Sequence, residues 1–266
     1  MTTAYLLNTD QQGVNRLETQ AKLYNPASQQ LLKDAGLSEG QSVLEVGCGT
    51  GTMTTWLCEQ VGQQGAVCAI DITPEYVTAV QQLVAPYPQA HVQQLDITKD
   101  PIPGHFDVIY CRMVLHHLAH PKAVLSKLSQ RLNPNGKIVC EEPPAMAQCF
   151  TYPPSPAFER FIDLVLKTFR ANGKDYEIAY TQYEHLASLG LTLEKQQTFQ
   201  PLLNQEERAL HLMGLRDVSP ALLAQNVATP QEVTVLTQEV TQALSNAEIV
   251  SLYKLFQVIA CNKAGS

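Results

Sequence analysis

Short apolar segments alternate with amphipathic ones along residues 42–142, and this alternation constrains the fold more than any other feature. Segments typical of β-strands occupy residues 42–46, 66–71, 91–96, 106–111 and 137–142. Segments with helical spacing lie between them, at residues 52–61, 74–85 and 121–132. Strands that alternate with helices form a parallel sheet covered by helices on both faces. The sequence therefore predicts an α/β protein with a doubly wound, mostly parallel sheet.

The flanking segments add helices and two further strands. Residues 10–34 have helical spacing, and Pro26 suits the first position of a second helix that starts there. The turn NPNG is expected to end the helix of residues 121–132. After a proline-rich loop, the pattern predicts helices near 158–169 and 181–189, then strands at 192–199 and 252–262. The two late strands bring the predicted Rossmann-like sheet to seven strands.

We divide the chain into three parts on this basis. Residues 1–36 form a helical leader, residues 37–143 an α/β core that binds a cofactor, and residues 144–266 the substrate side. A helical insertion of about residues 202–250 interrupts the last part and is longer than ordinary loops. Such insertions often form lids or substrate pockets, and a packing or homodimer role stays open.

The composition narrows the class of molecules that this protein is expected to bind. The net charge is −7, hydrophobic residues make up 45% and charged residues 16%, which favours a packed core over disorder. The densest basic group, Lys122, Lys127 and Arg131, is spread along one predicted helix. Neutralising many phosphates needs clustered cations, so we expect no nucleic-acid partner.

The chain also lacks the usual targeting signals. The first residues have neither a basic nor an apolar region of a signal peptide, and no apolar run approaches the roughly 18 residues of a membrane span. The seven cysteines are scattered and mostly lie in apolar runs. This pattern predicts reduced thiols in the core of a cytoplasmic protein without a membrane partner.

A glycine-rich turn, VLEVGCGTGT at residues 43–52, connects the first strand to a helix. Gly47 and Gly49 permit positive φ and close backbone approach, and Gly51 permits tight packing of helix on strand. The helix start is expected to offer free N–H groups and positive potential to an anionic group. A dinucleotide pyrophosphate and an amino-acid carboxylate both qualify.

Acidic residues at neighbouring strand ends separate these alternatives. A dinucleotide fingerprint requires glycine at position 52, where this chain has Thr52. Asp71 ends the second strand and can accept hydrogen bonds from ribose hydroxyls. Leu95, Asp96 and Ile97 follow the third strand and offer an acid for an adenine amino group between apolar contacts. Together these elements predict a nucleoside with an amino-acid tail.

The combination resembles the class I S-adenosylmethionine-dependent methyltransferases over about residues 40–143. VLEVGCGTG is similar to the first motif of that family, AIDIT to its ribose acid, QLDIT to its adenine loop, and FDVIYCRMVLHHL to its fourth strand and following helix. LNPNGKIVCEEP resembles the approach to the fifth strand. The leader YLLNTDQQGVNRLETQ resembles that of some bacterial small-molecule methyltransferases, in which it closes over the cofactor.

The resemblance implies a set of residues that bind S-adenosyl-L-methionine. The methionine end would lie at Gly47, Cys48 and Gly49, with Glu45 supporting the turn. The ribose would bind Asp71, with Ile72 against the adenine. The remaining implied contacts are Asp96 and Ile97 at the adenine edge, Cys111 and Arg112 after the fourth strand, and Tyr5 and Gln20 in the leader.

Two adjacent histidines are the candidates for catalysis. His116 and His117 follow the fourth strand at the edge where open α/β sheets bind ligands, and one of them is our candidate base. His116 and His120 are four residues apart, but no carboxylate completes a metal set, so no metal is predicted. Glu141 and Glu142 end the fifth strand on opposite faces, and one of them is placed to reach the acceptor.

The leading hypothesis is therefore methyl transfer to a small organic acceptor by in-line displacement. DNA amino-methylating enzymes resemble one another in an Asn/Asp-Pro-Pro-Tyr/Phe motif, and this chain has YCRM at that place. Two alternatives remain open: an NAD(P)-dependent oxidoreductase on the same sheet, and a non-catalytic protein that binds S-adenosylmethionine.

Overall fold

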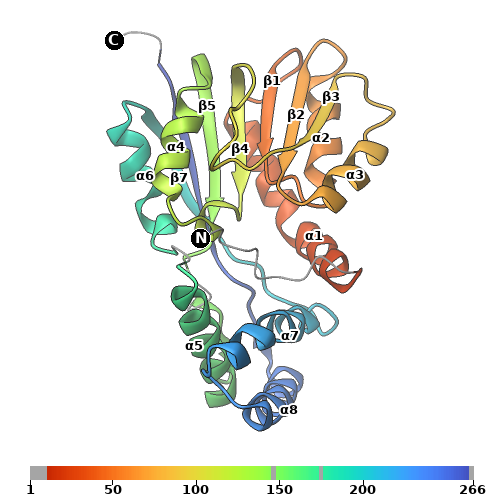
Figure 1. Ribbon diagram of the computed structural model, residues 1–266, viewed down its shortest axis with the longest axis vertical. Helices are drawn as coiled ribbons and strands as arrows, with labels where there is room; N and C mark the ends of the chain where they lie inside the picture. The colour runs from red at the N-terminus through yellow and green to blue at the C-terminus, as the bar shows by residue number, and fades with distance from the viewer. Residues whose placement is uncertain (1–10, 145–147, 174–175, 264–266) are drawn as a thin grey trace.

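The computed structural model describes residues 11–144, 148–173 and 176–263, and its main feature is a seven-stranded sheet in the order β3-β2-β1-β4-β5-β9-β7 (Figure 1). The strands of this sheet are β1 (Ser42–Val46), β2 (Ala66–Asp71), β3 (Ala90–Gln94), β4 (Phe106–Arg112), β5 (Leu132–Glu142), β7 (Thr192–Phe199) and β9 (Leu255–Cys261). β1 to β5 pair in parallel, and β9 is antiparallel to both of its neighbours. The predicted fold class is confirmed.

Helices cover both faces of the sheet and form a separate group beside it. They are α1 (Gln11–Asp34), α2 (Thr52–Val61), α3 (Pro74–Leu83), the short 3-10 helix η1 (Leu115–His117), α4 (Pro121–Ser129), α5 (Pro156–Ala171), α6 (Ile178–Ser188), α7 (Ala209–Ala224) and α8 (Pro230–Asn246). A small second sheet pairs β6 (Thr151–Tyr152) with β8 (Ile249–Val250). Within the described part of the chain, no helix combines the length and apolarity that crossing a membrane requires.

Alternating side chains of the central strands build a core on each face of the sheet. Val43 packs toward α1 and α2, with Leu31 and Leu57 among its neighbours. Leu44 packs on the other face, in the core that includes Leu125 of α4 and Leu186 of α6. Burial on both faces explains why these strands read as nearly continuous apolar runs in the sequence.

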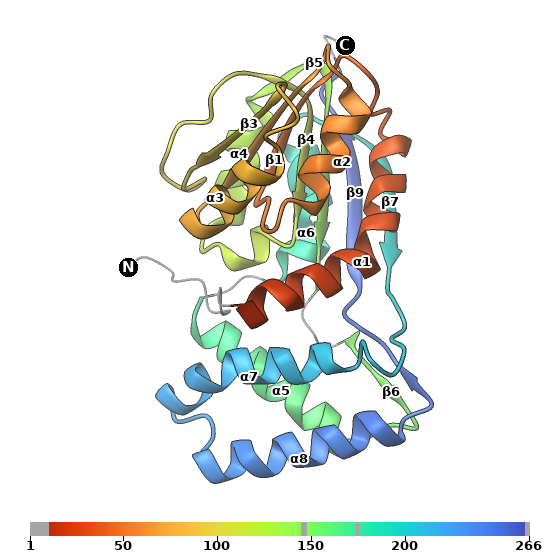
Figure 2. The ribbon, with the colours of Figure 1, turned by 90° about the vertical axis from the view of Figure 1, so that its right-hand side faces the viewer.

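A second helical group lies beyond the carboxyl ends of the parallel strands. α5, α7 and α8 share a hydrophobic core of their own, and α1 runs between this group and the sheet (Figure 2). The predicted insertion of about residues 202–250 therefore contains the two helices α7 and α8. This arrangement places α1, α5 and α7 around the edge of the sheet where the glycine turn lies.

α1 is a single helix, so the predicted restart at Pro26 is wrong. Pro26 lies inside Gln11–Asp34, where its ring removes one backbone hydrogen bond and bends the helix without ending it. The change of direction is visible in Figure 2. The bend lets one half of α1 pack on the sheet while the other half reaches toward α7.

The turn predicted at residues 133–136 is also wrong, because β5 already begins at Leu132. The pairing of β4 with β5 shifts register between Phe106 and Val108, which absorbs the extra residues as a bulge. Asn135 has a φ of 64°, and its N–H donates to the carbonyl of Asn262 at 2.7 Å. The turn-forming residues therefore produce an irregular strand start, and α4 ends earlier than predicted.

Candidate functional site

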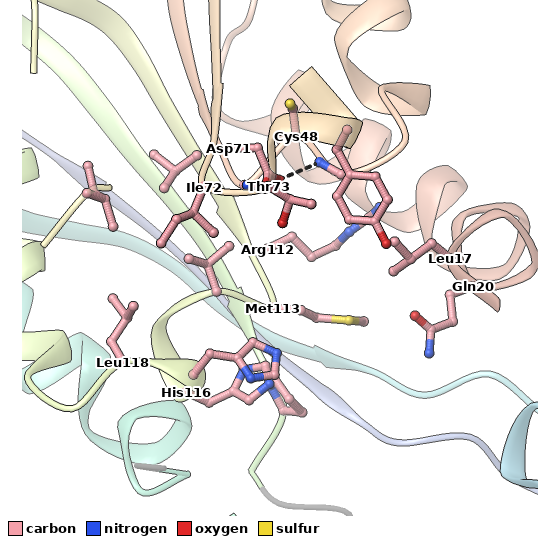
Figure 3. A pocket seen from close by; sticks show the side chains of 18 of the residues that line it. Leu17, Gln20, Cys48, Asp71, Ile72, Thr73, Arg112, Met113, His116 and Leu118 are labelled. Carbon is pink, nitrogen blue, oxygen red and sulfur yellow. Dashed lines mark hydrogen bonds between the residues drawn. The ribbon is translucent and has the colours of Figure 1, made fainter. Parts of the chain in front are cut away.

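One cavity of about 600 Å³ lies between the carboxyl edge of the sheet, α1 and the α5–α7 side. Its lining contains residues from the glycine turn, from the ends of β2 and β4, and from the loop after β3. Figure 3 shows Asp71 and Ile72 on one side of it, His116 on another, and Leu17 and Gln20 entering from α1. The cavity therefore joins the predicted cofactor region to the predicted substrate side.

The glycine turn is anchored to β2 through its own amides. Gly47 and Cys48 donate their N–H groups to the carbonyl of Ile70, at 2.8 and 3.1 Å, and Gly49 donates to Oδ2 of Asp71 at 3.0 Å. The N–H groups of these three residues are therefore already used within the protein. The amides hold the turn in a fixed shape against the neighbouring strand.

Glycine is required at two positions of this turn. The φ angles of Gly47 and Gly51 are 74° and 77°, in the left-handed region. A Cβ atom on Gly47 would lie 2.4 Å from Cγ2 of Val114, and one on Gly51 would lie 2.8 Å from Cγ2 of Val80. A side chain at either residue would clash as well as strain the backbone, which explains the glycine spacing.

Glu45 is a buried carboxylate behind the turn. The Thr54 hydroxyl donates to its Oε2 at 2.5 Å, and burial raises the pKa of Glu45 to about 7 despite that hydrogen bond and the nearby charge of Arg112. Arg112 itself donates to Ser28 and Asn25 of α1, at 2.8 and 2.9 Å. Both residues line the cavity, and both also fasten the turn and α1 to the sheet.

The two acids predicted to bind the nucleoside line the same cavity. Asp71 accepts hydrogen bonds from the backbone N–H groups of Gly49 and Thr73, and its burial raises the pKa of its carboxyl. Asp96 lies beyond the end of β3 and forms an ion pair with Lys99 at 2.7 Å. Ile72 is 54% exposed, which leaves its side chain available to a ring.

α1 provides a third wall. Leu17 and Gln20 line the cavity, and Gln20 donates to the hydroxyl of Tyr253 while accepting from Arg16 at 3.3 Å. Arg16 also pairs with Asp217 of α7 at 3.1 Å, with both side chains almost fully buried. Tyr5, which the resemblance implies in cofactor binding, lies outside the described residues.

His116 is held by a buried carboxylate at the opposite side of the cavity. Glu142 accepts the backbone N–H groups of Val114 and Leu115, at 2.9 and 2.8 Å, and lies 2.6 Å from Nδ1 of His116. Because the carboxylate accepts from these donors, Nδ1–H is the natural donor to it, and Nε2 is the basic nitrogen. His117 lies beside His116, with ring centroids 3.9 Å apart, and also lines the cavity.

Two predicted features differ from the structure here. Cys111 is fully buried in the core on one face of the sheet and is absent from the cavity lining, because its side chain alternates away from that of Arg112. His116 and His120 share no helix, since η1 ends at His117 and α4 begins at Pro121. Among the described residues, no group of three or more potential ligands could hold a metal ion.

Several cavity residues had no signal of their own in the sequence. Arg16 lies within the quoted leader, but its partner Asp217 is 201 positions away. Tyr176, His211 and Tyr253 also line the cavity. They come from separate elements whose packing is not visible in local spacing, so only the structure brings them together.

Comparisons with known proteins agree on one family. Residues 44–138 match the family model described as a methyltransferase domain. The chain is 26% identical over 151 residues to a demethylmenaquinone methyltransferase of Lysinibacillus sphaericus, covering 54% of this chain and 63% of the relative. It is 33% identical over 111 residues to a ubiquinone biosynthesis O-methyltransferase of Pseudomonas paraeruginosa, covering 39% of this chain and 44% of the relative.

Residues 44–138 are therefore a methyltransferase domain of the S-adenosylmethionine-dependent type. The matches span less than two thirds of the length of these two curated relatives. The fold agrees with that of a solved putative methyltransferase from Bacillus halodurans, with a TM-score of 0.61, 16% identity, and coverage of 88% of this chain and 98% of that one. S-adenosyl-L-methionine is the cofactor that this family implies.

The donor set of the cavity fits this cofactor. Asp71 offers carboxylate oxygens at the edge of the cavity, Ile72 offers an exposed apolar surface, and the glycine turn permits close backbone approach. These features suit a ribose, an adenine ring and an amino-acid end. The chemistry of the cavity and the match to a methyltransferase domain point to the same ligand.

Proposed function

We propose that this protein transfers a methyl group from S-adenosyl-L-methionine to a small organic acceptor by in-line displacement. The observation that carries the proposal is a single cavity lined by both the cofactor-type residues, such as Asp71 and Asp96, and by His116 and the helices α5 and α7. A sulfonium methyl is already electrophilic, so catalysis depends mostly on holding donor and acceptor in line.

The proposed roles follow the geometry of the cavity. Asp71 receives the ribose hydroxyls, and Ile72 and Ile97 pack on the adenine, whose amino group donates to Asp96. The turn of residues 47–49, supported by Glu45, contacts the methionine end through its backbone. Gln20, with the rest of α1, covers the cofactor, and we assign Tyr5 to the same cover.

We assign His116 the role of general base for the acceptor. Its Nδ1 is 2.6 Å from the Glu142 carboxylate, which fixes the ring and strengthens Nε2 as a proton acceptor. Its ring also stacks on Tyr176, with centroids 5.0 Å apart, which further limits its movement. His117 is the alternative base in the same cavity. Because the curated relatives are named for methylation of demethylmenaquinone and for O-methylation in ubiquinone biosynthesis, hydroxylated ring compounds are the first acceptors to test.

Calorimetry with S-adenosylmethionine and S-adenosylhomocysteine tests the cofactor site. We expect Asp71→Asn to weaken both ligands at least about tenfold, because a charge-assisted hydrogen bond to ribose is lost. Asp107→Asn is the matched control: Asp107 lies at the start of β4, bonds Ser42 and Asn133, and does not line the cavity. Equal affinity in the Asp71 variant and the wild type would contradict the assignment, and tight NADH binding instead would favour an oxidoreductase.

A further inference from the structure

We propose that the cavity-facing side of α7 selects the methyl acceptor: Gly214 leaves room for an apolar ring, and Nδ1 of His211 receives a hydrogen bond from an O–H or N–H group on it. This inference rests on the proposed methyl transfer and deepens it, since it names the class of acceptor. Two independent observations, one at each residue, carry it.

Gly214 is a glycine that neither its backbone nor its packing requires. It lies inside α7, where glycine is among the least favourable residues, and its φ lies outside the left-handed region. A Cβ atom built on it would have no atom within 4 Å apart from its chain neighbours and the nearby backbone of its own helix. Gly214 lines the cavity together with Leu210 and Val218, which lie one turn before and after it on the same stripe. The missing side chain therefore enlarges the cavity.

His211 presents a ring nitrogen that can only accept a hydrogen bond. Its Nε2 lies 2.9 Å from the carbonyl oxygen of Ser251, and a carbonyl only accepts, so Nε2 carries the proton. Nδ1 is then an acceptor, and within the described residues it has no hydrogen-bond partner although the side chain is 1% exposed. Burial lowers the pKa of His211 to about 4, which keeps the ring neutral near pH 7.

A buried acceptor without a partner is unfavourable unless a ligand supplies the donor. His211 also lines the cavity and lies three residues from Gly214, so the two residues are neighbours on the helix surface. The edge-to-face contact of its ring with Phe158, at 4.9 Å between centroids, prevents it from turning freely. A ligand in the cavity is the source of the donor that this proposal assigns to Nδ1.

The rest of this wall is apolar. Val165 and Phe169 of α5 face the same cavity, as does Met113 from beyond β4. The ion pair of Arg16 with Asp217, which links α1 to α7 here, has its opposite charges in contact and buried. These surroundings favour an uncharged ring compound with a hydroxyl or amine hydrogen over a charged or purely polar acceptor.

Substitution of Gly214 tests whether its missing side chain makes space for the acceptor ring. The probe is 2-naphthol, titrated by ligand-observed NMR into protein saturated with S-adenosylhomocysteine. We expect Gly214→Ala to raise the melting temperature by about 2 °C, because alanine favours the helix, yet to weaken naphthol roughly threefold, and Gly214→Leu to abolish its binding. The matched control is Thr237→Ala on the exposed face of α8, which lies outside the cavity and should leave naphthol affinity unchanged.

Substitution of His211 tests the hydrogen bond. Gln can still donate to the Ser251 carbonyl, so His211→Gln removes the Nδ1 acceptor with the least disturbance. Wild-type protein should prefer 2-naphthol over naphthalene about fivefold, the effect of one neutral hydrogen bond, and the variant should bind both equally.

The outcomes separate this inference from the proposed function. If S-adenosylhomocysteine binds but 2-naphthol does not, or if Gly214→Leu binds 2-naphthol as well as the wild type, the inference is overturned and the cofactor site stands. A preference for 2-naphthol that survives in His211→Gln overturns the role of Nδ1. If S-adenosylhomocysteine itself fails to bind, the proposed function has failed first.

Discussion

At the residue scale, two buried acidic side chains hold the loops and the histidine that line the cavity in place. Glu142 receives N–H groups from the segment after β4 and orients His116, while Glu45 lies behind the glycine turn with Thr54. Burial raises the pKa of each carboxyl to about 7. A carboxylate that keeps its charge in the interior needs several donors, and here those donors are the loops that form the cavity.

The proposed base is tested by replacing His116 with asparagine. The asparagine amide can still donate to Glu142, but it lacks a nitrogen in the place of Nε2. We expect kcat with a hydroxylated ring compound to fall roughly 100-fold or more, the usual range for a lost general base, with S-adenosylhomocysteine affinity unchanged. His91→Asn on the exposed face of β3 is the control. Full activity in His116→Asn, with a loss in His117→Asn, would transfer the role to His117.

The titration of Glu45 makes stability depend on pH. Its pKa is about 7 in the folded protein against 4.5 ordinarily, so the unfolded chain releases this proton first as the pH rises. The stability contribution of the protonated group is present below about pH 4.5 and is lost as the pH rises through 7. We expect the wild type to lose up to about 3 kcal/mol relative to Glu45→Gln between pH 5 and 8. Parallel curves from urea unfolding of the two proteins would contradict this.

The Arg16–Asp217 ion pair is the main polar link between α1 and α7 at the scale of elements. Both side chains are almost inaccessible, and Arg216 also contacts Asp217, at 2.5 Å. A buried pair contributes little relative to an apolar replacement, but the loss of one partner leaves a charge without compensation. The pair therefore fixes where α1 lies more than it stabilises the fold.

Removing one member of this ion pair should destabilise the folded protein. We expect Asp217→Asn to lower the free energy of unfolding by about 3–5 kcal/mol, because the buried arginine loses its counter-charge. Asp163→Asn is the matched control, since its ion pair with Lys167 on α5 is more than half exposed, and exposed pairs contribute little. The measurement is urea denaturation at pH 7. A similar small effect of both substitutions would show that water reaches the α1–α7 contact.

The individual helices and strands also show where local sequence patterns are sufficient to predict the structure. β1, β2 and the glycine turn were predicted at their observed residues, because burial on both faces and the need for positive φ leave strong local signals. The bulged start of β5 was missed, because residues 133–136 have turn chemistry and only the pairing with β4 draws them into a strand. The α7 wall was missed for a related reason: the proposed roles of His211 and Gly214 depend on which residues face them across the cavity.

The whole molecule is organised around one boundary between the sheet and the group of α5, α7 and α8. α1 occupies that boundary and contacts both sides: Tyr24 stacks on Tyr253 at 5.7 Å between centroids, and Arg112 bonds to Asn25. The fold class follows from the sequence, and so does the set of residues proposed to bind the cofactor, because most of them lie within about 100 consecutive residues. The proposed acceptor side does not, because it is assembled from segments of α1, α5 and α7 distant in the chain.

β9 lies between β5 and β7 in the sheet, although it is made after every other strand. While a nascent chain is still on the ribosome and β9 is unfinished, β5 keeps an unpaired edge. Leu252 and Tyr253, which line the cavity just before β9, have no fixed place until that strand is inserted. Translation must therefore run almost to the end of the described chain before this wall of the cavity is complete, and an arrested shorter product would expose its open edge to chaperones and to other chains.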